Sequence, residues 1–257
     1  TFDQVMMAPV VGNLTDDNAD EKIDEHDVPD IVFTTFAGGA YTGLGVLRVI
    51  SGDDGREHWS SSSLNVPINV WGSAGIALGD IDGDGVVEII VQNQNNTDGT
   101  GGGVLALEHD GRMKWRQASA VGNAHGGAAI ANIDGQGSPE IVTRSEVLSA
   151  TGQVICSFPT TTILPLVADL DGDGVQEIVH GEAIYRLVNA TATDGTGCAE
   201  VSPGYAGYTA VAQFDADPEP EIVVAHDGQL ALLDGDGTEI WKIDLPLDAG
   251  RITTEFG

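Results

Sequence analysis

A short acidic motif recurs along the chain, and its spacing limits what the chain can fold into. Four copies align without gaps: DIDGDGVVEIIV from Asp80, NIDGQGSPEIVT from Asn132, DLDGDGVQEIVH from Asp169 and QFDADPEPEIVV from Gln213. An expanded copy, NLTDDNADEKIDEHDVPDIVF, begins at Asn13 and is the first of the five in chain order. Repeats at a period of about 45 residues are typical of chains built from one supersecondary unit used several times.

Each copy is surrounded by the same sequence of predicted strands. A short run of small residues such as AGIAL precedes the motif, and the EIVV-type strand ends it. A third strand then leads through an Asp-Gly type turn, a strong hairpin signal, into a fourth strand that ends near a tryptophan or a cysteine. Four strands per period predict the blade of a β-propeller, and no segment shows helical periodicity over a useful length.

We therefore predict an all-β fold, a β-propeller of four-stranded antiparallel blades. The expected domain is a single propeller over residues 1–257, with blades at about 1–60, 61–117, 118–158, 159–202 and 203–244. Residues 245–257 are expected to form the first strand of a further blade or a strand that closes the ring.

The repeats resemble the FG-GAP/VCBS repeats of calcium-binding β-propellers, the group that includes the integrin α-subunit head. The resemblance covers nearly the whole chain, and the form D-x-D-G-D-G-x-x-E-I-V carries it. Propellers of this kind commonly have six to eight blades. Five visible copies therefore imply either a small closed propeller or a piece of a longer chain, and we favour the piece.

Two of the loops have a full set of oxygen ligands for a metal ion. Carboxylates at alternate positions of a tight loop suit Ca²⁺, which takes six to eight oxygens. The expected ligands, with a valine carbonyl in each loop, are Asp80, Asp82, Asp84, Val86 and Glu88, and Asp169, Asp171, Asp173, Val175 and Glu177. The alternative is an acidic β-turn without metal, in which the carboxylates would repel one another.

Two further loops have weaker ligand sets, for which metal and no metal are equal alternatives. The third copy offers Asn132, Asp134, Gln136, Ser138 and Glu140, of which only two are charged. The fifth offers Gln213, Asp215, Asp217, Glu219 and Glu221. Pro218 stands there in place of a glycine, so the loop geometry is expected to differ.

The first loop follows a different pattern, that of the twelve-residue EF-hand loop. Its expected ligands are Asp16, Asn18, Asp20, the carbonyl of Lys22, Asp24 and Asp27. Glu21 departs from the pattern because glycine is usual there, and Asp27 replaces the usual glutamate. We predict a calcium loop of EF-hand type inserted in a blade.

The two cysteines of the chain occur near the ends of neighbouring fourth strands. Aligning these strands places Trp59, Trp115, Cys156, Cys198 and Trp241 in one column. The paired exchange of tryptophan for cysteine favours a disulfide between Cys156 and Cys198, which would indicate an oxidising compartment. Two independent buried thiols are the alternative.

The charge of the chain restricts its partners. The chain has 40 acidic and 10 basic residues and a formal net charge of −30. Nucleic-acid binding needs a basic face, so this composition argues against it. No run of 18 apolar residues occurs, so no membrane insertion is expected.

Residues for binding a partner are expected on the face opposite the metal loops. The candidates are Trp71, His125, Arg144, His180, Tyr205, Tyr208 and His226, and the same face also collects Phe36, Tyr41, Asn93 and Arg251. Aromatic and hydrogen-bonding groups of this kind suit a glycan or an extracellular protein, although loop aromatics often only cover the ends of strands.

The sequence thus favours a secreted or cell-surface calcium-binding propeller that acts as a non-catalytic binding or adhesion module. One alternative is a polysaccharide lyase of the rhamnogalacturonan lyase type, with His125, His180, Arg144 and Arg251 as its candidate residues. Another is an architectural repeat unit of a surface filament or a larger chain.

Overall fold

The computed structural model describes residues 1–64, 68–94, 102–118, 125–159, 164–180, 183–203 and 207–246. These residues form β-strands and no helix. No helix in this part of the chain therefore has the length and apolarity needed to cross a membrane.

The strands are arranged in five antiparallel sheets of four, each built from strands consecutive in sequence. The first sheet contains β1 (Val10–Gly12), β2 (Asp30–Thr35), β3 (Leu44–Ile50) and β4 (Glu57–Ser60), and the second contains β6 (Ile76–Gly79), β7 (Glu88–Asn93), β8 (Gly103–Leu107) and β9 (Met113–Gln117). The short strand β5 (Val70–Trp71) pairs with both β3 and β7 and so links these two sheets.

The remaining three sheets are separate. They consist of β10 (Ala129–Ala131), β11 (Glu140–Val142), β12 (Glu146–Leu148) and β13 (Val154–Ser157); of β14 (Leu166–Ala168), β15 (Glu177–His180), β16 (Ala183–Leu187) and β17 (Cys198–Pro203); and of β18 (Tyr208–Ala212), β19 (Glu221–His226), β20 (Gln229–Leu233) and β21 (Glu239–Asp244). The predictions of an all-β chain and of four-stranded antiparallel sheets are confirmed for the described residues.

The hydrophobic core lies in layers between neighbouring sheets. Successive side chains of a strand point to opposite faces, so each second strand contributes to two layers. Ile89 packs against the first sheet and Ile90 against the third. In the same way Ile178 packs toward the third sheet and Val179 toward the fifth. The continuous apolar run after each acidic loop is therefore explained by burial on both faces.

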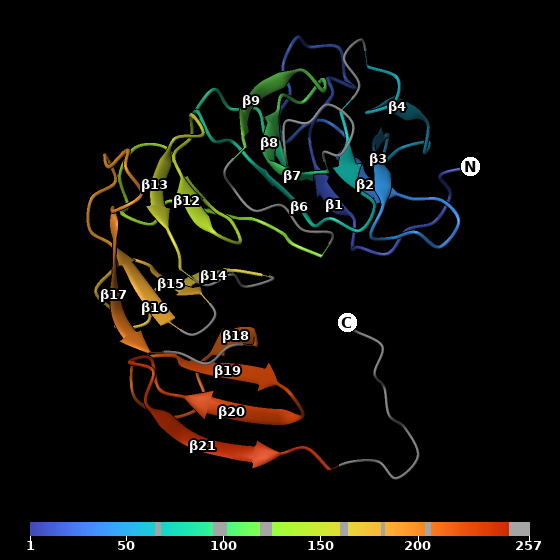
Figure 1. The fold of residues 1–257 in the computed structure, drawn as a ribbon. Coiled ribbons are helices and arrows are strands. Elements are labelled where there is room, and N and C mark those ends of the chain that lie inside the picture. The colour runs from blue at the N-terminus through green and yellow to red at the C-terminus, as the bar shows by residue number, and fades with distance from the viewer. Residues whose placement is uncertain are drawn as a thin grey trace.

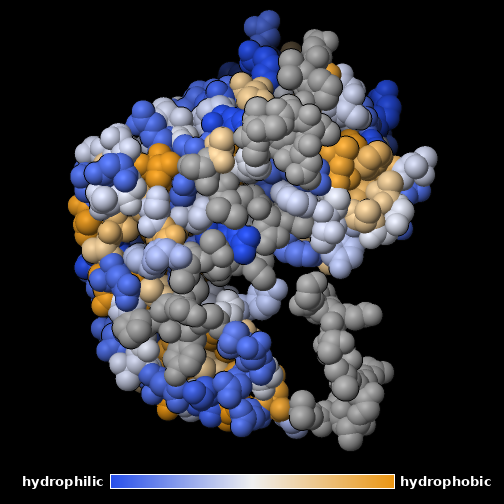
Figure 2. Space-filling view, viewed as in Figure 1, coloured by the Kyte–Doolittle hydropathy of each residue, from blue (hydrophilic) through white to orange (hydrophobic). Residues whose placement is uncertain are grey.

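The five sheets follow one another in an arc, with the first strands on its concave side and the last strands outside (Figure 1). The strands β1, β6, β10, β14 and β18 contact one another in that order along the inner edge. The outermost strand of the fifth sheet, β21, is exposed along its whole length. Hydrophilic residues cover much of the face shown in Figure 2, with hydrophobic residues in small separate patches.

The expected strand in residues 245–257 is not formed by Leu245 and Pro246, and the rest of that segment lies outside the described residues. The arc places the five loops between first and second strands at corresponding positions of the five sheets.

The pairing of the fourth strands corrects one prediction from the sequence. Trp59, Trp115, Cys156 and Trp241 each pair with a third-strand residue just before a register shift. In the fourth sheet the residue at this position is Ser202, opposite Ile184, whereas Cys198 lies opposite Leu187. The prediction that Cys198 shares the tryptophan column is wrong, because the β16–β17 hairpin is longer than its counterparts.

The longer hairpin also places Cys198 beside the third sheet. Gly197 donates a backbone hydrogen bond to Ile155, and Ser157 donates one to Gly195. The sulfur atoms of Cys156 and Cys198 are bonded in the structure, with Cα atoms 5.4 Å apart. The disulfide and these hydrogen bonds together join the outer edges of the third and fourth sheets.

Candidate metal centres

The acidic loops join the first and second strands of each sheet and share one buried anchor. Glu88 begins β7 and accepts a hydrogen bond from the backbone N–H of Ile81, 2.9 Å away. Three other glutamates that begin second strands accept the corresponding hydrogen bond, from Ile133 to Glu140, from Leu170 to Glu177 and from Phe214 to Glu221. Each glutamate is buried, so this hydrogen bond holds the closing carboxylate against the loop.

Asp30 is the counterpart of these glutamates in the first sheet. It is fully buried at the start of β2, and its Oδ2 accepts hydrogen bonds from the Leu14 N–H and the Thr15 hydroxyl. Asp30 is not among the ligands predicted from the sequence. The sequence does contain a pattern that indicates it: DIVF at Asp30 aligns with the EIVV segments when the greater length of the first loop is taken into account.

Three loops gather carboxylate oxygens closely enough to hold a metal ion. Among the described residues, one ligand atom from each member of three groups lies within 4.8 Å of the others: Asp80, Asp82 and Glu88; Asp169, Asp171 and Glu177; and Asp215, Asp217 and Glu221. An all-oxygen donor set of this kind fits a hard cation such as Ca²⁺.

The remaining carboxylates of the second and fourth loops stabilise the turns. Asp84 Oδ1 accepts the backbone N–H of Val86, and Asp173 Oδ1 accepts that of Val175, each at 2.8 Å. The glycines between the aspartates have positive φ, for example +82° at Gly83. The loop path therefore needs glycine, as the sequence indicated.

The fifth loop reaches a similar arrangement without glycine, and it contains an unsatisfied oxygen. Glu221 is 1% exposed, and its Oε1 is buried without a hydrogen-bond partner in the described structure. A buried carboxylate oxygen without a partner is costly, and a bound cation would satisfy it. The donor set of this loop therefore fits a metal ion.

In the second loop a lysine side chain already contacts the carboxylates. Lys114 in β9 donates hydrogen bonds from Nζ to Asp82, to Glu88 and to Glu108, the last two at 3.2 Å. Although desolvation acts in the opposite direction, these three carboxylates raise the pKa of Lys114 above its usual range. Burial raises the pKa of Glu88, and the Ile81 N–H and Lys114 partly oppose that shift.

The fourth loop has an arginine in the equivalent role, from a different strand. Arg186 in β16 donates to Glu177 Oε1 from Nε at 2.9 Å and from Nη2 at 2.7 Å, and it also contacts Asp171. These hydrogen bonds raise the pKa of Arg186 and lower that of Asp171. Asp169 Oδ1 in the same loop is buried without a partner.

In the first sheet the basic side chain beside the closing carboxylate is a histidine. His58 in β4 immediately precedes Trp59, as Lys114 precedes Trp115, and its Nε2 lies 2.8 Å from Asp30 Oδ1. Three of the five closing carboxylates therefore have a basic side chain of the protein beside them. These basic residues were not predicted as site residues, because they are distant in sequence from the loops.

The third loop brings together fewer charges. Glu140 is buried, which raises its pKa, and the nearby Asp134 acts in the same direction. Asn132 donates to the Gly137 carbonyl, while its Oδ1 is buried without a partner. Gln136 and Ser138 are exposed, so the described contacts offer a poorer donor set than the second loop does.

The first loop uses its carboxylates mainly on its own backbone. Asp16 accepts hydrogen bonds from the N–H groups of Asp20 and Glu21, and Asp20 accepts that of Lys22. Asp27 accepts the N–H groups of Asp17, Asn18 and Asp24. Glu21 has φ of +70°, so the position at which the sequence lacked glycine does adopt the left-handed conformation. Calcium binding by this loop stays a prediction.

The predicted partner-binding residues that the structure describes lie in different sheets and loops. His180 is fully buried, stacked on the ring of Phe158 at a centroid distance of 4.0 Å. Its Nε2 lies 2.8 Å from the Arg144 carbonyl, and its Nδ1 has no partner in the described structure. The assignment of His180 to an exposed binding face is wrong, because the last residue of β15 points into the core between the third and fourth sheets.

The other candidates are spread over the arc. His125 contacts the ring of Tyr41 at 5.7 Å, and Tyr41 contacts Phe36. Trp71 packs against the core between the first two sheets. Tyr208 and His226 are exposed on the fifth sheet, where His226 lies 3.0 Å from Asp227. Tyr205 and Arg251 lie outside the described residues.

The buried His180 predicts a pH dependence of stability. Burial lowers its pKa below the ordinary value of 6.5. As pH falls below about 6.5 the unfolded chain binds a proton that the folded chain does not, so the free energy of unfolding decreases by up to about 1.4 kcal/mol per pH unit. His180→Gln is expected to reduce this slope in urea unfolding between about pH 6.5 and 5. An unchanged slope would show that His180 is protonated in the folded protein.

Comparison with known proteins gives structural neighbours and no family. No protein-family model matches the chain, and no curated protein matches it. The structure is similar to the V. cholerae biofilm matrix protein Bap1, with 30% identity and a TM-score of 0.78. The match covers 94% of this chain and 40% of that one, so the chain spans about two fifths of the length of Bap1.

Two rhamnogalacturonan lyases share the fold at lower identity. The Bacillus licheniformis enzyme matches with 17% identity and a TM-score of 0.61, over 93% of this chain and 51% of the enzyme. The lyase YesW matches with 19% identity and a TM-score of 0.51, over 86% of this chain and 36% of the enzyme. At these identities the likeness concerns the fold alone.

Proposed function

We propose that the chain is a calcium-binding β-propeller, or part of one, that serves as a non-catalytic binding module of an extracellular matrix. Its five four-stranded sheets, arranged in an arc with their first strands inside, support the propeller. The partner we propose is a glycan or an extracellular protein. The similarity to a biofilm matrix protein at 30% identity supports an extracellular location.

The observation that carries the calcium proposal is the convergence of three carboxylates in each of three loops. Like charges at such distances repel strongly unless a cation lies between them. In the fifth loop no described basic side chain forms an ion pair with Asp215, Asp217 or Glu221. Calcium therefore has the clearest role there, with Glu221 Oε1 as one ligand.

In the second and fourth loops an ion would compete with the protein's own cations. Calcium bound by Asp82 and Glu88 would repel the Lys114 ammonium and displace it toward Glu108, which is outside the loop. The same argument applies to Arg186 in the fourth loop. We expect these two loops to bind calcium less tightly than their sequences indicate.

Chelation tests the calcium proposal. A ligand at one hundred times its dissociation constant stabilises the folded state by about 2.7 kcal/mol per site. For a chain of this size 1 kcal/mol shifts the melting temperature by about 2–4 °C, so EDTA is expected to lower it by at least about 5–10 °C. The control is the melting temperature measured with Mg²⁺ in place of Ca²⁺ at the same concentration. A melting temperature that EDTA leaves unchanged would contradict structural calcium.

Binding to a glycan array, measured with calcium and with EDTA, tests whether the chain binds a glycan. We expect retention on at least one glycan class with calcium and weaker retention without it.

The lyase alternative is tested by release of unsaturated products from uronic-acid polymers. Of its proposed residues, His180 is buried and Arg251 lies outside the described residues. Ordered self-assembly without any glycan binding would favour the architectural alternative.

A further inference from the structure

Two junctions between neighbouring sheets are filled by a tryptophan of the outermost strand. Trp59 Nε1 donates to the His109 carbonyl at 3.0 Å, and Trp115 Nε1 donates to the Ala150 carbonyl at 2.8 Å. Each acceptor lies in the third-to-fourth-strand turn of the next sheet. A Cβ at Gly152 would lie 2.7 Å from the Trp115 ring, so the turn is shaped to receive the indole.

The junction between the fourth and fifth sheets lacks this tryptophan. Ser202 stands at the tryptophan position, and its hydroxyl donates to the carbonyl of Asp236 in the turn of the fifth sheet. Serine is much smaller than tryptophan, and a cavity of about 470 Å³ lies at this junction. Pockets for small organic ligands begin at about 300 Å³.

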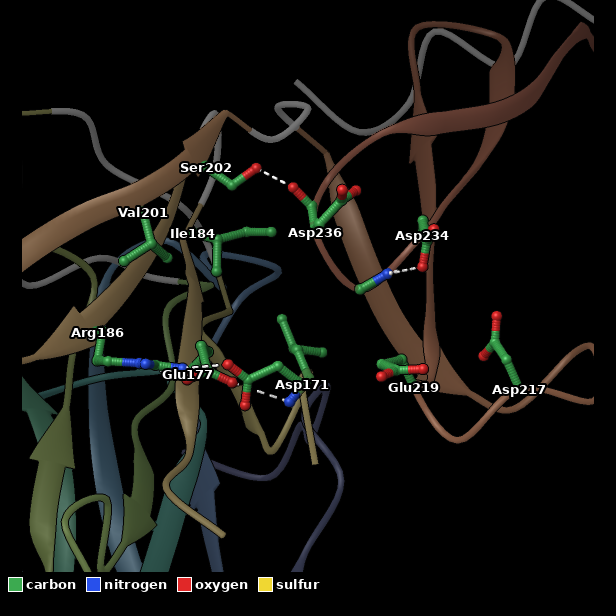
Figure 3. A pocket seen from close by; sticks show the side chains of 12 residues that line it. Asp171, Glu177, Ile184, Arg186, Val201, Ser202, Asp217, Glu219, Asp234 and Asp236 are labelled. Atoms are coloured by element: carbon green, nitrogen blue, oxygen red, sulfur yellow. Dashed lines mark hydrogen bonds and ion pairs between the residues drawn. The ribbon is translucent and has the colours of Figure 1, made fainter. Parts of the chain in front are cut away.

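One wall of the cavity belongs to the fourth sheet. Leu170, Ile184 and Val201 are its apolar lining residues, and Figure 3 shows Ile184 and Val201 on this wall. Arg186 also lines this wall, and it is paired there with Glu177 and Asp171. The positive charge of Arg186 therefore offsets part of the negative charge of these two carboxylates.

The opposite wall is acidic and belongs to the fifth sheet. It carries Asp217, Glu219, Asp234 and Asp236, and none of these four has an ion-pair partner in the described part of the chain. The carboxylates without an ion-pair partner are thus concentrated on one side of the cavity.

We propose that this cavity binds a flat organic cation with N–H donors, an amidinium or guanidinium group on an apolar body. Such a group can lie against Leu170 and Val201 as an indole would. Its N–H groups can donate to the turn carbonyls, and its charge matches the carboxylates of the opposite wall. The ligand is either a small amidine or the arginine side chain of a partner polypeptide.

This site differs from the proposed calcium loops in its ligand and in its essential residues. Asp234 and Asp236 lie in a hairpin turn outside the loop of residues 213–221. A metal ion bound in the neighbouring loops would neutralise Asp217 and leave these two carboxylates for the organic cation. The proposal therefore does not depend on calcium binding.

Isothermal titration with benzamidine, and with neutral benzamide as the control, tests the proposal in calcium and in EDTA. We expect benzamidine to bind at least tenfold more tightly than benzamide. Ser202→Trp, which introduces the residue found at the junctions of the first with the second and of the second with the third sheet, is expected to abolish binding. Asp234→Asn combined with Asp236→Asn is expected to weaken it at least tenfold.

The matched control is Asp110→Asn, at the turn position that corresponds to Asp236 but in a junction filled by Trp59. It is expected to leave benzamidine binding unchanged. Equal binding of benzamidine and benzamide, or full binding by a folded Ser202→Trp variant, would overturn the proposal. If Ser202→Trp does not fold, the variant with both Asp234→Asn and Asp236→Asn decides whether the proposal holds. A capped Gly-Arg-Gly peptide and agmatine then distinguish an arginine side chain from a free small ligand.

Discussion

Replacing both cysteines, Cys156→Ser with Cys198→Ser, is expected to lower the free energy of unfolding by about 4 kcal/mol. The disulfide closes a loop with a sequence separation of 42 residues, and loop-closure entropy predicts an effect of this size. The bond also holds the extended β16–β17 hairpin against the third sheet, where no tryptophan fills the junction. Urea unfolding of the variant and of the native protein measures the difference.

Reductant provides the control for this experiment. Dithiothreitol is expected to move the unfolding midpoint of the native protein toward that of the variant and to leave the variant unchanged. If the two proteins unfold at the same urea concentration, the disulfide does not stabilise the junction. The long hairpin would then be held by its backbone hydrogen bonds to Ile155 and Ser157 alone.

Replacing Lys114 by methionine is expected to destabilise the calcium-free protein by about 3 kcal/mol. Glu88 is 1% exposed, and removing one partner of a buried ion pair leaves an uncompensated charge. Adding calcium is expected to restore most of this loss, because the ion would replace the ammonium group beside Glu88. Chemical denaturation with EDTA and with calcium measures both effects.

Lys242→Met is the matched control, because Lys242 pairs with Glu239 on an exposed strand. Its effect is expected to stay below about 1 kcal/mol, as is usual for surface pairs. Lys114→Met combined with Glu88→Gln should recover part of the lost stability. A Lys114→Met variant as stable as the native protein in EDTA would show that Glu88 is protonated or solvated in the folded state.

Local sequence patterns predicted much of the fold, because they repeat. The apolar runs after each acidic loop predicted the second strands, and the Asp-Gly turns predicted the hairpins. Glycines with positive φ occur in the loops where the sequence placed them, and Glu21 takes that conformation where glycine was missing. These features depend on residues close together in the chain, so the sequence contains the information.

Features that depend on distant residues could not be predicted in this way. Lys114 and Arg186 reach the acidic loops from the fourth and third strands of their sheets, and sequence spacing does not show which side chain crosses a sheet to meet a carboxylate. Asp30 was missed because the first loop is longer than the others. His180 was placed on the wrong surface because β15 ends inside the layer between two sheets.

The sequence by itself determined the repeat, the strand order within each sheet and the acidic composition of the loops, since all three follow from periodicity and residue chemistry. Only the tertiary structure decided how the sheets meet. A longer hairpin moved Cys198 out of the tryptophan column and put Ser202 into it, because strand pairing follows the hydrogen-bond register and not the nearest sequence alignment. That shift joined one pair of sheets by a disulfide and left a cavity between the next pair.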